Sequence, residues 1–123
     1  MAIRVLVADD ARFMRQLIRE IIEPEGFDVV GEAADGRAVV EEYTRLHPDL
    51  VTMDIVMPKR SGLDALKEIL ALDPAARVVM VSALGQEALV MEALQAGATD
   101  YLVKPFKPES VVATLRKVSE KER

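Results

Sequence analysis

Three aspartates are the residues of this sequence that are best suited to do chemistry. Asp9 and Asp10 follow one apolar run of the chain, and Asp54 follows another. If the fold brings these carboxylates together, they repel one another strongly unless a cation is shared among them. Oxygen ligands favour a hard ion such as Mg²⁺, which is bound by one or two protein carboxylates and keeps several waters. The aspartates therefore indicate a Mg²⁺ site, provided that the elements before them lie side by side.

A hydroxyl and an ammonium group follow two further apolar runs, at Ser82 and Lys104. Taken singly, each candidate has an ordinary structural explanation. The aspartate pair could end a strand and cap a helix, Asp54 could lie in a loop, Ser82 in a turn, and Lys104 could be a solvated charge. Together, however, they supply the metal site, the hydrogen-bond donor and the counter-charge that bind a phosphoryl group. The combination favours phosphoryl chemistry over unrelated structural roles.

The elements that must position these residues are short apolar runs that alternate with segments of helical period. The apolar runs cover residues 3–8, 27–32, 50–53, 78–81 and 101–103. Between them, apolar residues recur three or four positions apart, as on one face of a helix. Turn and capping residues separate the segments: Pro24, Gly26, Asp35, Gly36, Ser61, Gly97 and Pro108. Strands that alternate with helices in this way predict an α/β fold with a parallel sheet covered on both faces.

The charges within the apolar runs predict the order of the strands. Three runs are almost purely apolar, as is expected of central parallel strands: 3–8, 50–53 and 78–81. The other two contain acidic residues, and we place them at the edges: 27–33 and 99–103. This pattern predicts a doubly wound, flavodoxin-like sheet in the order 2-1-3-4-5, in which ligands bind beyond the carboxyl ends of the strands. The candidate residues would then meet at one rim of the sheet.

The apolar periods also predict which helix faces are buried. In the first helical segment, we expect one apolar face at Phe13, Leu17 and Ile21, backed by Met14, Ile18 and Ile22. In the fourth, we expect the buried face at Ala88, Met91 and Leu94, which leaves Leu89 and Val90 outside. Apolar residues outside a buried face and close to Tyr101 indicate a docking groove for a partner helix. The alternative for Leu89 and Val90 is extra packing against the last helix.

Size and composition restrict the possible functions. With 123 residues, the chain is long enough for one domain and too short for two. A net charge of −5 argues against a nucleic-acid surface, which needs a basic stripe. No apolar run approaches the roughly 20 residues that cross a bilayer, and the absence of cysteine excludes disulfides and thiolate metal sites. We expect a cytoplasmic monomer that binds neither nucleic acid nor membrane.

These motifs, in this order, resemble the receiver domains of two-component signalling, and within that family the single-domain chemotaxis regulators. The matching residues are Asp9-Asp10, Asp54, Gly62 with Asp64, Ser82-Ala83 and Lys104-Pro105-Phe106. The resemblance covers essentially the whole chain, so residues 1–123 are interpreted as a single receiver domain. It implies a signalling switch rather than a classical enzyme.

The resemblance implies specific roles for the acidic residues. Asp54 would be the nucleophile that takes a phosphoryl group from a phosphohistidine on a partner kinase. Asp10 and Asp54, with the main-chain carbonyl of Val56, would bind Mg²⁺ directly, and Asp9 would act through a bound water. Lys104 would hold a phosphoryl oxygen, and its peptide bond to Pro105 would be cis. This is the arrangement expected for metal-dependent phosphoryl transfer.

The resemblance also implies a route from phosphorylation to output. Ser82 would move towards the acyl phosphate and vacate space near Tyr101. Tyr101 would then turn inward and change the surface formed by the fourth helix, the fifth strand and the fifth helix, which would bind the flagellar motor switch protein. This is a two-state element biased by one phosphoryl group.

Two departures from the family pattern concern the stability of the phosphorylated state. The family commonly has threonine where this chain has Ser82, and the missing methyl group would loosen the coupling. Val56 and Leu84 occupy the positions that flank the path of the hydrolytic water, and neither side chain can orient it by a hydrogen bond. We therefore expect slow self-dephosphorylation and a separate phosphatase.

Two other functions remain open at this point. The chain could be a phosphorelay intermediate that passes its phosphoryl group to a histidine phosphotransfer protein. It could also be a metal-dependent phosphohydrolase of similar architecture, but such an enzyme needs a general acid two residues after the nucleophile, where this chain has Val56. Excision from a longer DNA-binding regulator is a further possibility for the chain as a whole.

Overall fold

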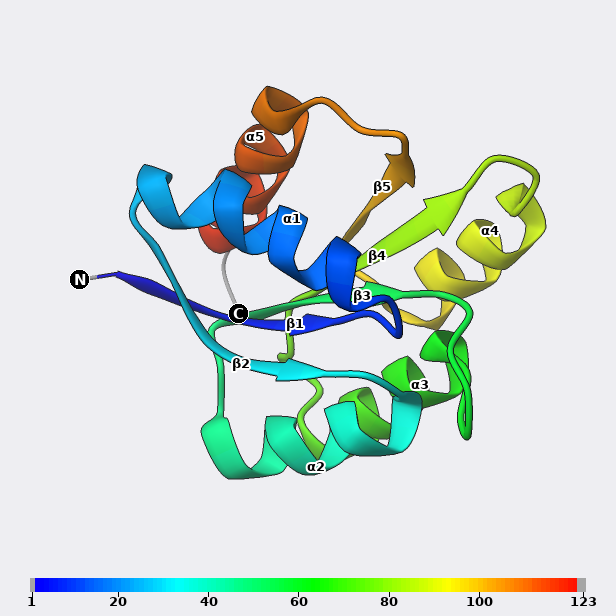
Figure 1. Cartoon of the computed structure of the whole chain (residues 1–123). Coiled ribbons are helices and arrows are strands. Elements are labelled where there is room, and N and C mark those ends of the chain that lie inside the picture. The colour runs from blue at the N-terminus through cyan, green and yellow to red at the C-terminus, as the bar shows by residue number, and fades with distance from the viewer. Residues whose placement is uncertain (1, 122–123) are drawn as a thin grey trace.

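The computed structural model describes residues 2–121, in which strands and helices alternate regularly (Figure 1). The strands are β1 (Ile3–Ala8), β2 (Phe27–Ala33), β3 (Leu50–Asp54), β4 (Val78–Ala83) and β5 (Asp100–Lys104). The helices are α1 (Arg12–Ile22), α2 (Gly36–Leu46), α3 (Gly62–Leu72), α4 (Glu87–Ala96) and α5 (Pro108–Ser119), with a single 3₁₀ turn η1 (Glu23–Glu25) after α1. The predicted alternation of strands and helices is confirmed.

The sheet is parallel throughout and has the order β2-β1-β3-β4-β5. Both the predicted order and the two predicted edge strands are therefore correct. The sequence reveals the edges because β2 and β5 expose part of their length to water, whereas every residue of β3 is buried. Since the chain reverses its direction of winding at β1 and β3, the carboxyl ends of these two strands are the expected place for a ligand.

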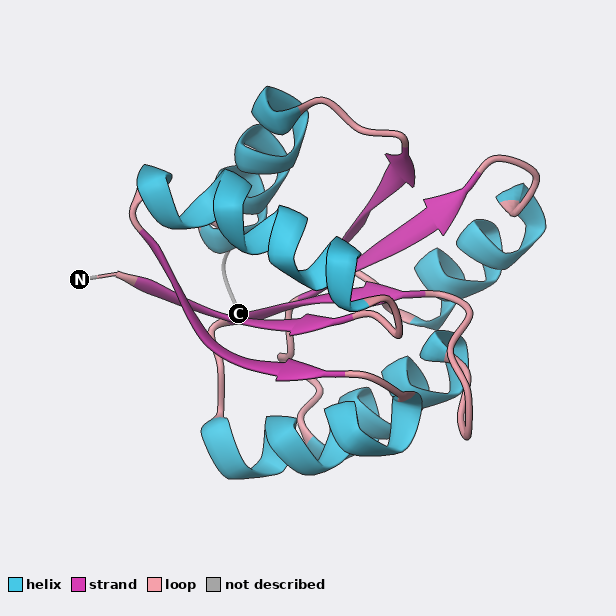
Figure 2. Ribbon diagram, in the orientation of Figure 1, coloured by secondary structure: helices cyan, strands magenta, loops and turns pink. Residues whose placement is uncertain are grey.

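Two layers of helices enclose the sheet, as the ribbon diagram shows (Figure 2). Successive residues of a strand point to opposite faces, so Val5 and Val7 pack on the side of α1 and α5, while Leu6 packs on the side of α2, α3 and α4. Both faces of the central strands are therefore dry. This is why those strands have almost unbroken apolar sequences.

Caps begin the helices at the residues that the sequence indicates. The Asp35 carboxylate accepts a hydrogen bond from the Ala38 amide at 2.7 Å at the start of α2, and the Ser61 hydroxyl accepts one from the Asp64 amide at 3.1 Å at the start of α3. Gly97 ends α4 with a φ of 117°, a conformation that glycine adopts without a steric cost. These local signals fix where each helix meets the rim of the sheet.

The prediction for the buried face of α1 is wrong at Phe13, whose side chain is 75% exposed. The buried residues of α1 are Ile18 and Ile22, which were expected to back that face, and Ile21 packs partly buried against the same core. The difference arises because α1 carries more apolar residues than one stripe can hold, and its first turn stands beside the rim of the sheet rather than over it. Phe13 consequently lines a surface groove of about 350 Å³ together with Met14, Leu17, Lys104, Pro105 and Phe106.

The prediction for α4 is wrong at Ala88, Val90 and Met91, whereas Leu94 of the expected buried face does pack against the core. Val90 is only 7% exposed and packs in the core with Ala93, and Leu89 is half-buried against the same core. Met91, which was expected inside, is 56% exposed. The helix is apolar on most sides, so its period alone does not determine which stripe faces the sheet. Leu89 and Val90 are therefore not an apolar surface outside the buried face.

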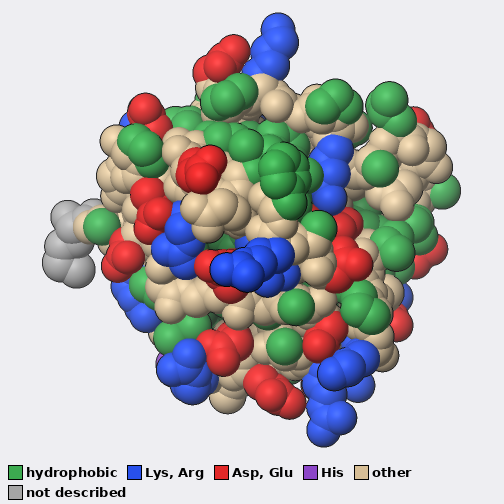
Figure 3. Space-filling model, viewed as in Figure 1, with side chains coloured by type: hydrophobic (Ala, Val, Ile, Leu, Met, Phe, Trp, Pro, Cys, Tyr) green, Lys and Arg blue, Asp and Glu red, His purple; other side chains and the backbone are tan. Residues whose placement is uncertain are grey.

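The surface carries both charge signs without an extended patch of either one on the face that is visible in Figure 3. Hydrophobic side chains gather in the upper part of this view, over α1 and α5. Within residues 2–121, no helix has the length and apolar character required to span a membrane.

Candidate functional site

The three aspartates meet at the carboxyl ends of β1 and β3. These strands pair directly, with Ala8 opposite Met53, so the residues that follow them lie side by side. One carboxylate oxygen from each of Asp9, Asp10 and Asp54 lies within 4.8 Å of the others. Asp9 is 1% exposed and Asp54 is also buried, whereas Asp10 is exposed. The sequence prediction that these carboxylates converge is therefore confirmed.

Lys104 reaches this cluster from the end of β5. Its ammonium nitrogen lies 3.1 Å from Oδ2 of Asp9 and 3.4 Å from Oδ2 of Asp54. The peptide bond between Lys104 and Pro105 is cis, as expected. Because β4 separates β5 from β3, the lysine side chain must cross the end of β4 to make both contacts. One cation of the protein is thus shared by two buried acids.

Burial and neighbouring charges shift the pKa values of Asp54 and Lys104. Burial raises the pKa of Asp54 above its ordinary value and the charge of Asp9 adds to the effect, whereas Lys104 and the Val56 amide oppose it. Burial by itself would lower the pKa of Lys104, but its hydrogen bond to Asp9 and the charges of Asp54 and Asp9 raise it overall. Lys104 therefore stays protonated. The ionised form of Asp54 is still disfavoured, so an additional cation would stabilise it.

The loop after β3 is held close to Asp54 by its backbone. Oδ1 of Asp54 accepts a hydrogen bond from the Val56 amide at 3.3 Å, and the Gly62 amide donates to the Ile55 carbonyl at 2.7 Å. A Cβ atom on Gly62 would lie 1.9 Å from the carbonyl oxygen of Asp54. Glycine is thus required here because the start of α3 packs directly against the end of β3. The Val56 side chain is exposed.

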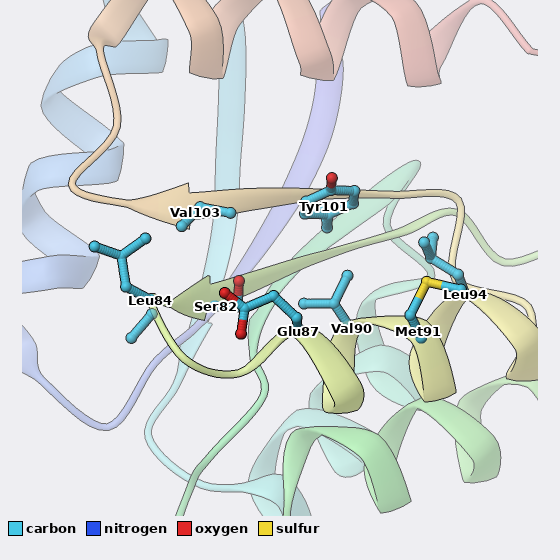
Figure 4. Close-up of a pocket in the computed structure, with 9 residues that line it drawn as sticks. Ser82, Leu84, Glu87, Val90, Met91, Leu94, Tyr101 and Val103 are labelled. Atoms are coloured by element: carbon cyan, nitrogen blue, oxygen red, sulfur yellow. The ribbon is translucent and has the colours of Figure 1, made fainter.

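Ser82 lies at the end of β4 beside an open groove between α4 and β5. Its buried hydroxyl lies 3.4 Å from the carbonyl oxygen of Leu102. The groove has a volume of about 280 Å³ and is mostly apolar. Figure 4 shows Tyr101 and Val103 along its β5 side and Val90, Met91 and Leu94 along its α4 side. Tyr101 is exposed, and so is Leu84 at one end of the groove.

The arrangement can hold a hard dication and a phosphoryl group next to each other. Its donor set consists of carboxylate oxygens, which suit Mg²⁺, and two of the three carboxylates are buried where bulk water does not screen their repulsion. Lys104 offers protons to an anion at the same rim, and Ser82 brings a hydroxyl to it. The chemical groups present at this rim are therefore suitable ligands for both Mg²⁺ and a phosphoryl group.

Comparison with known proteins agrees with this chemistry. The sequence pattern described as the response regulator receiver domain matches residues 5–116. The chain belongs to this family. The chemotaxis protein CheY of Thermotoga maritima is 54% identical to this receiver domain over 116 residues, which are 94% of this chain and 97% of that protein.

Solved structures extend the likeness to three dimensions. The response regulator domain of Thermotoga maritima CheB shares 38% identity with this receiver domain and a TM-score of 0.92, with full coverage of both chains. A CheY from Borrelia burgdorferi, solved as a complex with CheX, BeF₃ and Mg²⁺, shares 39% identity and a TM-score of 0.92. The match covers 97% of this receiver domain and 90% of that chain.

Two features of this receiver domain escaped the sequence interpretation. One is the groove at Phe13, which was assigned to a buried face. The other is Arg15, which donates a hydrogen bond to the main-chain carbonyl of Asp9 at 2.7 Å. An arginine in an amphipathic helix usually indicates a solvated face, so no sequence signal distinguishes Arg15 from other surface arginines.

Proposed function

We propose that Asp54 accepts a phosphoryl group from a phosphohistidine on a histidine kinase. The observation that carries this proposal is the position of Asp54, a buried carboxylate that faces two other acids and a protonated lysine at the carboxyl rim. In the transfer, an oxygen of Asp54 forms a bond to phosphorus while the bond from phosphorus to the histidine nitrogen breaks. The nitrogen keeps the electron pair and is reprotonated from solvent.

The proposed metal is Mg²⁺, bound directly by Asp10, Asp54 and the main-chain carbonyl of Val56, with Asp9 acting through a water. When bound, Mg²⁺ would neutralise charge on the transferring oxygens. The Mg²⁺ that accompanies the Borrelia burgdorferi CheY supports this choice. Asp9 already has both carboxylate oxygens engaged, by the Ala11 amide at 2.9 Å and by Lys104, which suits an indirect role.

Lys104 and Ser82 are the proposed donors to the phosphoryl oxygens. Lys104 would exchange part of its contact with Asp9 and Asp54 for a phosphoryl oxygen, which is also a charge-assisted acceptor. Ser82 has only a long contact to the Leu102 carbonyl to give up, at 3.4 Å. Its movement would open space next to the groove, into which Tyr101 could turn. In this switch, a small movement of the buried Ser82 hydroxyl would allow a larger movement of the exposed Tyr101 ring.

The proposed output is binding to the flagellar motor switch protein through the surface of α4, β5 and α5. The groove between α4 and β5 supports this proposal, because Met91 and Tyr101 expose apolar surface there. The similarity to chemotaxis proteins favours this output over a phosphorelay intermediate. We further propose that residues 1–123 act as a single, monomeric and cytoplasmic receiver domain that binds neither nucleic acid nor membrane.

We also propose a slow loss of the phosphoryl group and a separate phosphatase. Val56 and Leu84 are exposed aliphatic side chains, so they offer neither a hydrogen bond nor a charge to a water that approaches the acyl phosphate. The same absence of a general acid at Val56 argues against a phosphohydrolase. A long-lived phosphoryl group would need a partner protein to remove it.

The test is phosphorylation by a small acyl-phosphate donor in the presence of Mg²⁺, with mass spectrometry as the readout. We expect the wild type to gain one phosphoryl group, Asp54→Ala to gain none, and Asp28→Ala, which removes an exposed acid from β2, to match the wild type. Removal of Mg²⁺ by a chelator should abolish the gain. Equal phosphorylation of the wild type and Asp54→Ala, or no phosphorylation of either, would refute the proposal.

A further inference from the structure

The backbone of Asp9 is held directly by the edge strand β2 and also by Arg15 of α1, which is itself bound to β2. Its amide donates to the carbonyl of Ala33 at 3.0 Å. Its carbonyl accepts from Nη1 of Arg15 at 2.7 Å, and Nε of the same guanidinium bonds Oε1 of Glu32 at 2.9 Å. Glu32 and Ala33 are consecutive residues of β2, so one short stretch of this strand fixes both peptide groups of Asp9.

The carbonyl that Arg15 holds belongs to the peptide group that joins Asp9 to Asp10. This matters because the two carboxylates are anchored very differently. Both oxygens of the Asp9 side chain have partners, the Ala11 amide at 2.9 Å and Lys104 at 3.1 Å. Asp10 is exposed, and within residues 2–121 no hydrogen bond or ion pair holds its side chain. The peptide plane before Asp10 therefore helps to set the direction of its Cα–Cβ bond, and with it the region that the carboxylate can reach.

Arg15 is well placed to fix that plane. Its side chain is only 15% exposed, although it is charged and lies on a surface helix. Its planar guanidinium presents several donors in a fixed geometry, so a contact to Glu32 at one nitrogen sets the direction of the other. Glu32 is itself held by Nη2 of Arg19 at 2.8 Å, one turn further along α1. The guanidinium of Arg15 therefore has little freedom to leave the Asp9 carbonyl.

We propose that Arg15 is a positioning residue for the metal site, which orients Asp10 for Mg²⁺ through the peptide group between Asp9 and Asp10. This inference rests on the proposed function, because it presupposes that the aspartate cluster binds Mg²⁺. Residues that orient metal ligands without touching the metal commonly change metal affinity by about tenfold or more. We expect an effect of about tenfold for the loss of Arg15.

In Arg15→Ala, the loss of a positive charge and the loss of the hydrogen bond to the Asp9 carbonyl are expected to change Mg²⁺ affinity in opposite directions. The sign of the change therefore distinguishes the two effects. Removing a positive charge near a cation site strengthens cation binding by electrostatics alone. Loss of the hydrogen bond to the Asp9 carbonyl weakens it, because Asp10 is no longer aligned. A weaker Mg²⁺ affinity of Arg15→Ala therefore cannot be an effect of the removed charge.

Arg19→Ala is the matched control. Arg19 binds the same carboxylate as Arg15 and also pairs with Glu23 at 3.0 Å, but it does not contact Asp9. It reproduces the loss of one positive charge and of one contact to Glu32. We expect Mg²⁺ affinity to stay within about twofold of the wild type, or to rise slightly, in this variant.

The experiment is a titration of the unphosphorylated full chain with Mg²⁺, followed by two-dimensional NMR of the backbone amides. We expect Arg15→Ala to bind about tenfold more weakly than the wild type and Arg15→Lys to recover part of the loss, because lysine keeps a charged donor group but lacks the planar fork of the guanidinium. Glu32→Gln should lie between the wild type and Arg15→Ala. Hydrogen exchange of the Ala11 amide should be faster in Arg15→Ala than in Arg19→Ala.

The possible outcomes separate this inference from the proposal on which it rests. If the wild type does not bind Mg²⁺ at the aspartates, the proposed function fails and this inference fails with it. If the wild type binds Mg²⁺ and Arg15→Ala binds it equally or more tightly, only the role of Arg15 is overturned. Should Arg15→Ala fold poorly, Arg15→Lys and Glu32→Gln decide the question, and unchanged affinity in both overturns the role of Arg15.

Discussion

Nζ of Lys104 lies 3.4 Å from Oδ2 of Asp54, across the end of a strand that separates the two residues in the sheet. The lysine lies closer to Asp9, at 3.1 Å, so its charge is divided between two acids. This division explains why burial still raises the pKa of Asp54 in spite of the lysine. The cluster retains an excess of negative charge, and the predictions below follow from that excess and from the packing around it.

We predict that Asp54→Asn stabilises the protein at neutral pH without Mg²⁺. The folded-state pKa of Asp54 lies above its ordinary value of 3.8. Between these two values the folded protein keeps a proton that the unfolded chain has released, so wild-type stability falls as pH rises through this window. Asp54→Asn has no carboxyl group at this position, so its stability does not decrease with pH for this reason. Its advantage should be absent below the ordinary pKa and reach the order of 1 kcal/mol at pH 7, as measured by urea unfolding in the presence of a chelator.

Asp100→Asn provides a control of opposite sign. Burial acts to raise the pKa of Asp100, but its contacts with Lys117 and the Tyr101 amide lower it overall. A carboxyl group of this kind stabilises the fold above its unfolded pKa, and the contribution is lost as pH falls through the folded value. Asp100→Asn should therefore be less stable than the wild type at pH 7. If Asp54→Asn is instead less stable than the wild type at pH 7, the ionised Asp54 side chain does not destabilise the folded state.

The strand order and the acidic cluster were predictable from the sequence because each depends on one strong signal. Acidic residues such as Asp28 and Asp100 are tolerated only where a strand meets water, and the carboxyl ends of adjacent parallel strands must meet at one rim. The faces of α1 and α4 were not predictable, because both helices are apolar beyond a single stripe. The choice between Val90 and Met91 as the buried residue depends on how α4 rotates against β4 and β5, which no local pattern encodes.

The contact of Arg15 with Asp9 was hidden for a different reason. It joins a side chain to a main-chain carbonyl, and a carbonyl has no signature in the sequence. Gly62 was found only through the family resemblance, because the close approach of its backbone to the Asp54 carbonyl depends on how α3 starts. The convergence of the aspartates and Lys104 could therefore be predicted, whereas the contact of Arg15 with the backbone of Asp9 could not.

We predict that Gly62→Ala disturbs both stability and phosphorylation. The new Cβ would lie 1.9 Å from the carbonyl oxygen of Asp54, so the backbone of β3 or α3 must shift. Such overpacking costs about 2 kcal/mol, and the shift displaces Asp54 itself. Urea unfolding and the rate of labelling by a small acyl-phosphate donor measure the two effects.

Gly26→Ala is the control for a purely conformational cost. Gly26 has a φ of 95° and open space where a Cβ would stand. Alanine should cost roughly 1–2 kcal/mol at this position and leave the rate of labelling unchanged. If Gly62→Ala is phosphorylated at the wild-type rate, the contact between α3 and Asp54 does not position the phosphoacceptor.

Phosphorylation of Asp54 should change the surroundings of Tyr101 and leave Tyr43 unaffected. Only these two tyrosines are present, and Tyr43 is buried on α2, away from the groove that Tyr101 lines between α4 and β5. After incorporation of 3-fluorotyrosine, ¹⁹F NMR gives one signal for each, and Tyr101→Phe assigns them. We expect the Tyr101 signal alone to move on phosphorylation. In Ser82→Ala the protein should still be labelled, but the Tyr101 signal should stay in place; an identical shift in this variant would exclude Ser82 from the switch.

The groove between α4 and β5 should be required for binding to the motor switch protein. Met91→Arg places a charge in the exposed lining of this groove, and we expect the affinity of the phosphorylated protein to fall about tenfold or more. Leu72→Arg introduces the same charge at an exposed position on α3 and should bind normally. Both variants should be labelled by a small donor at the wild-type rate. Equal binding by Met91→Arg and the wild type would place the partner surface elsewhere.

The lifetime of the phosphoryl group should depend on Val56 and Leu84. Both side chains are exposed beside the site and neither can orient a water. Val56→Asn adds an amide that can hydrogen-bond the attacking water, so we expect hydrolysis about tenfold faster. Val56→Ala removes bulk without adding a polar group, which separates orientation of the water from access to the acyl phosphate. Decay of the label after removal of the donor gives the rates. A half-life of only seconds in the wild type, or equal acceleration in both variants, would contradict a role for the missing hydrogen bond.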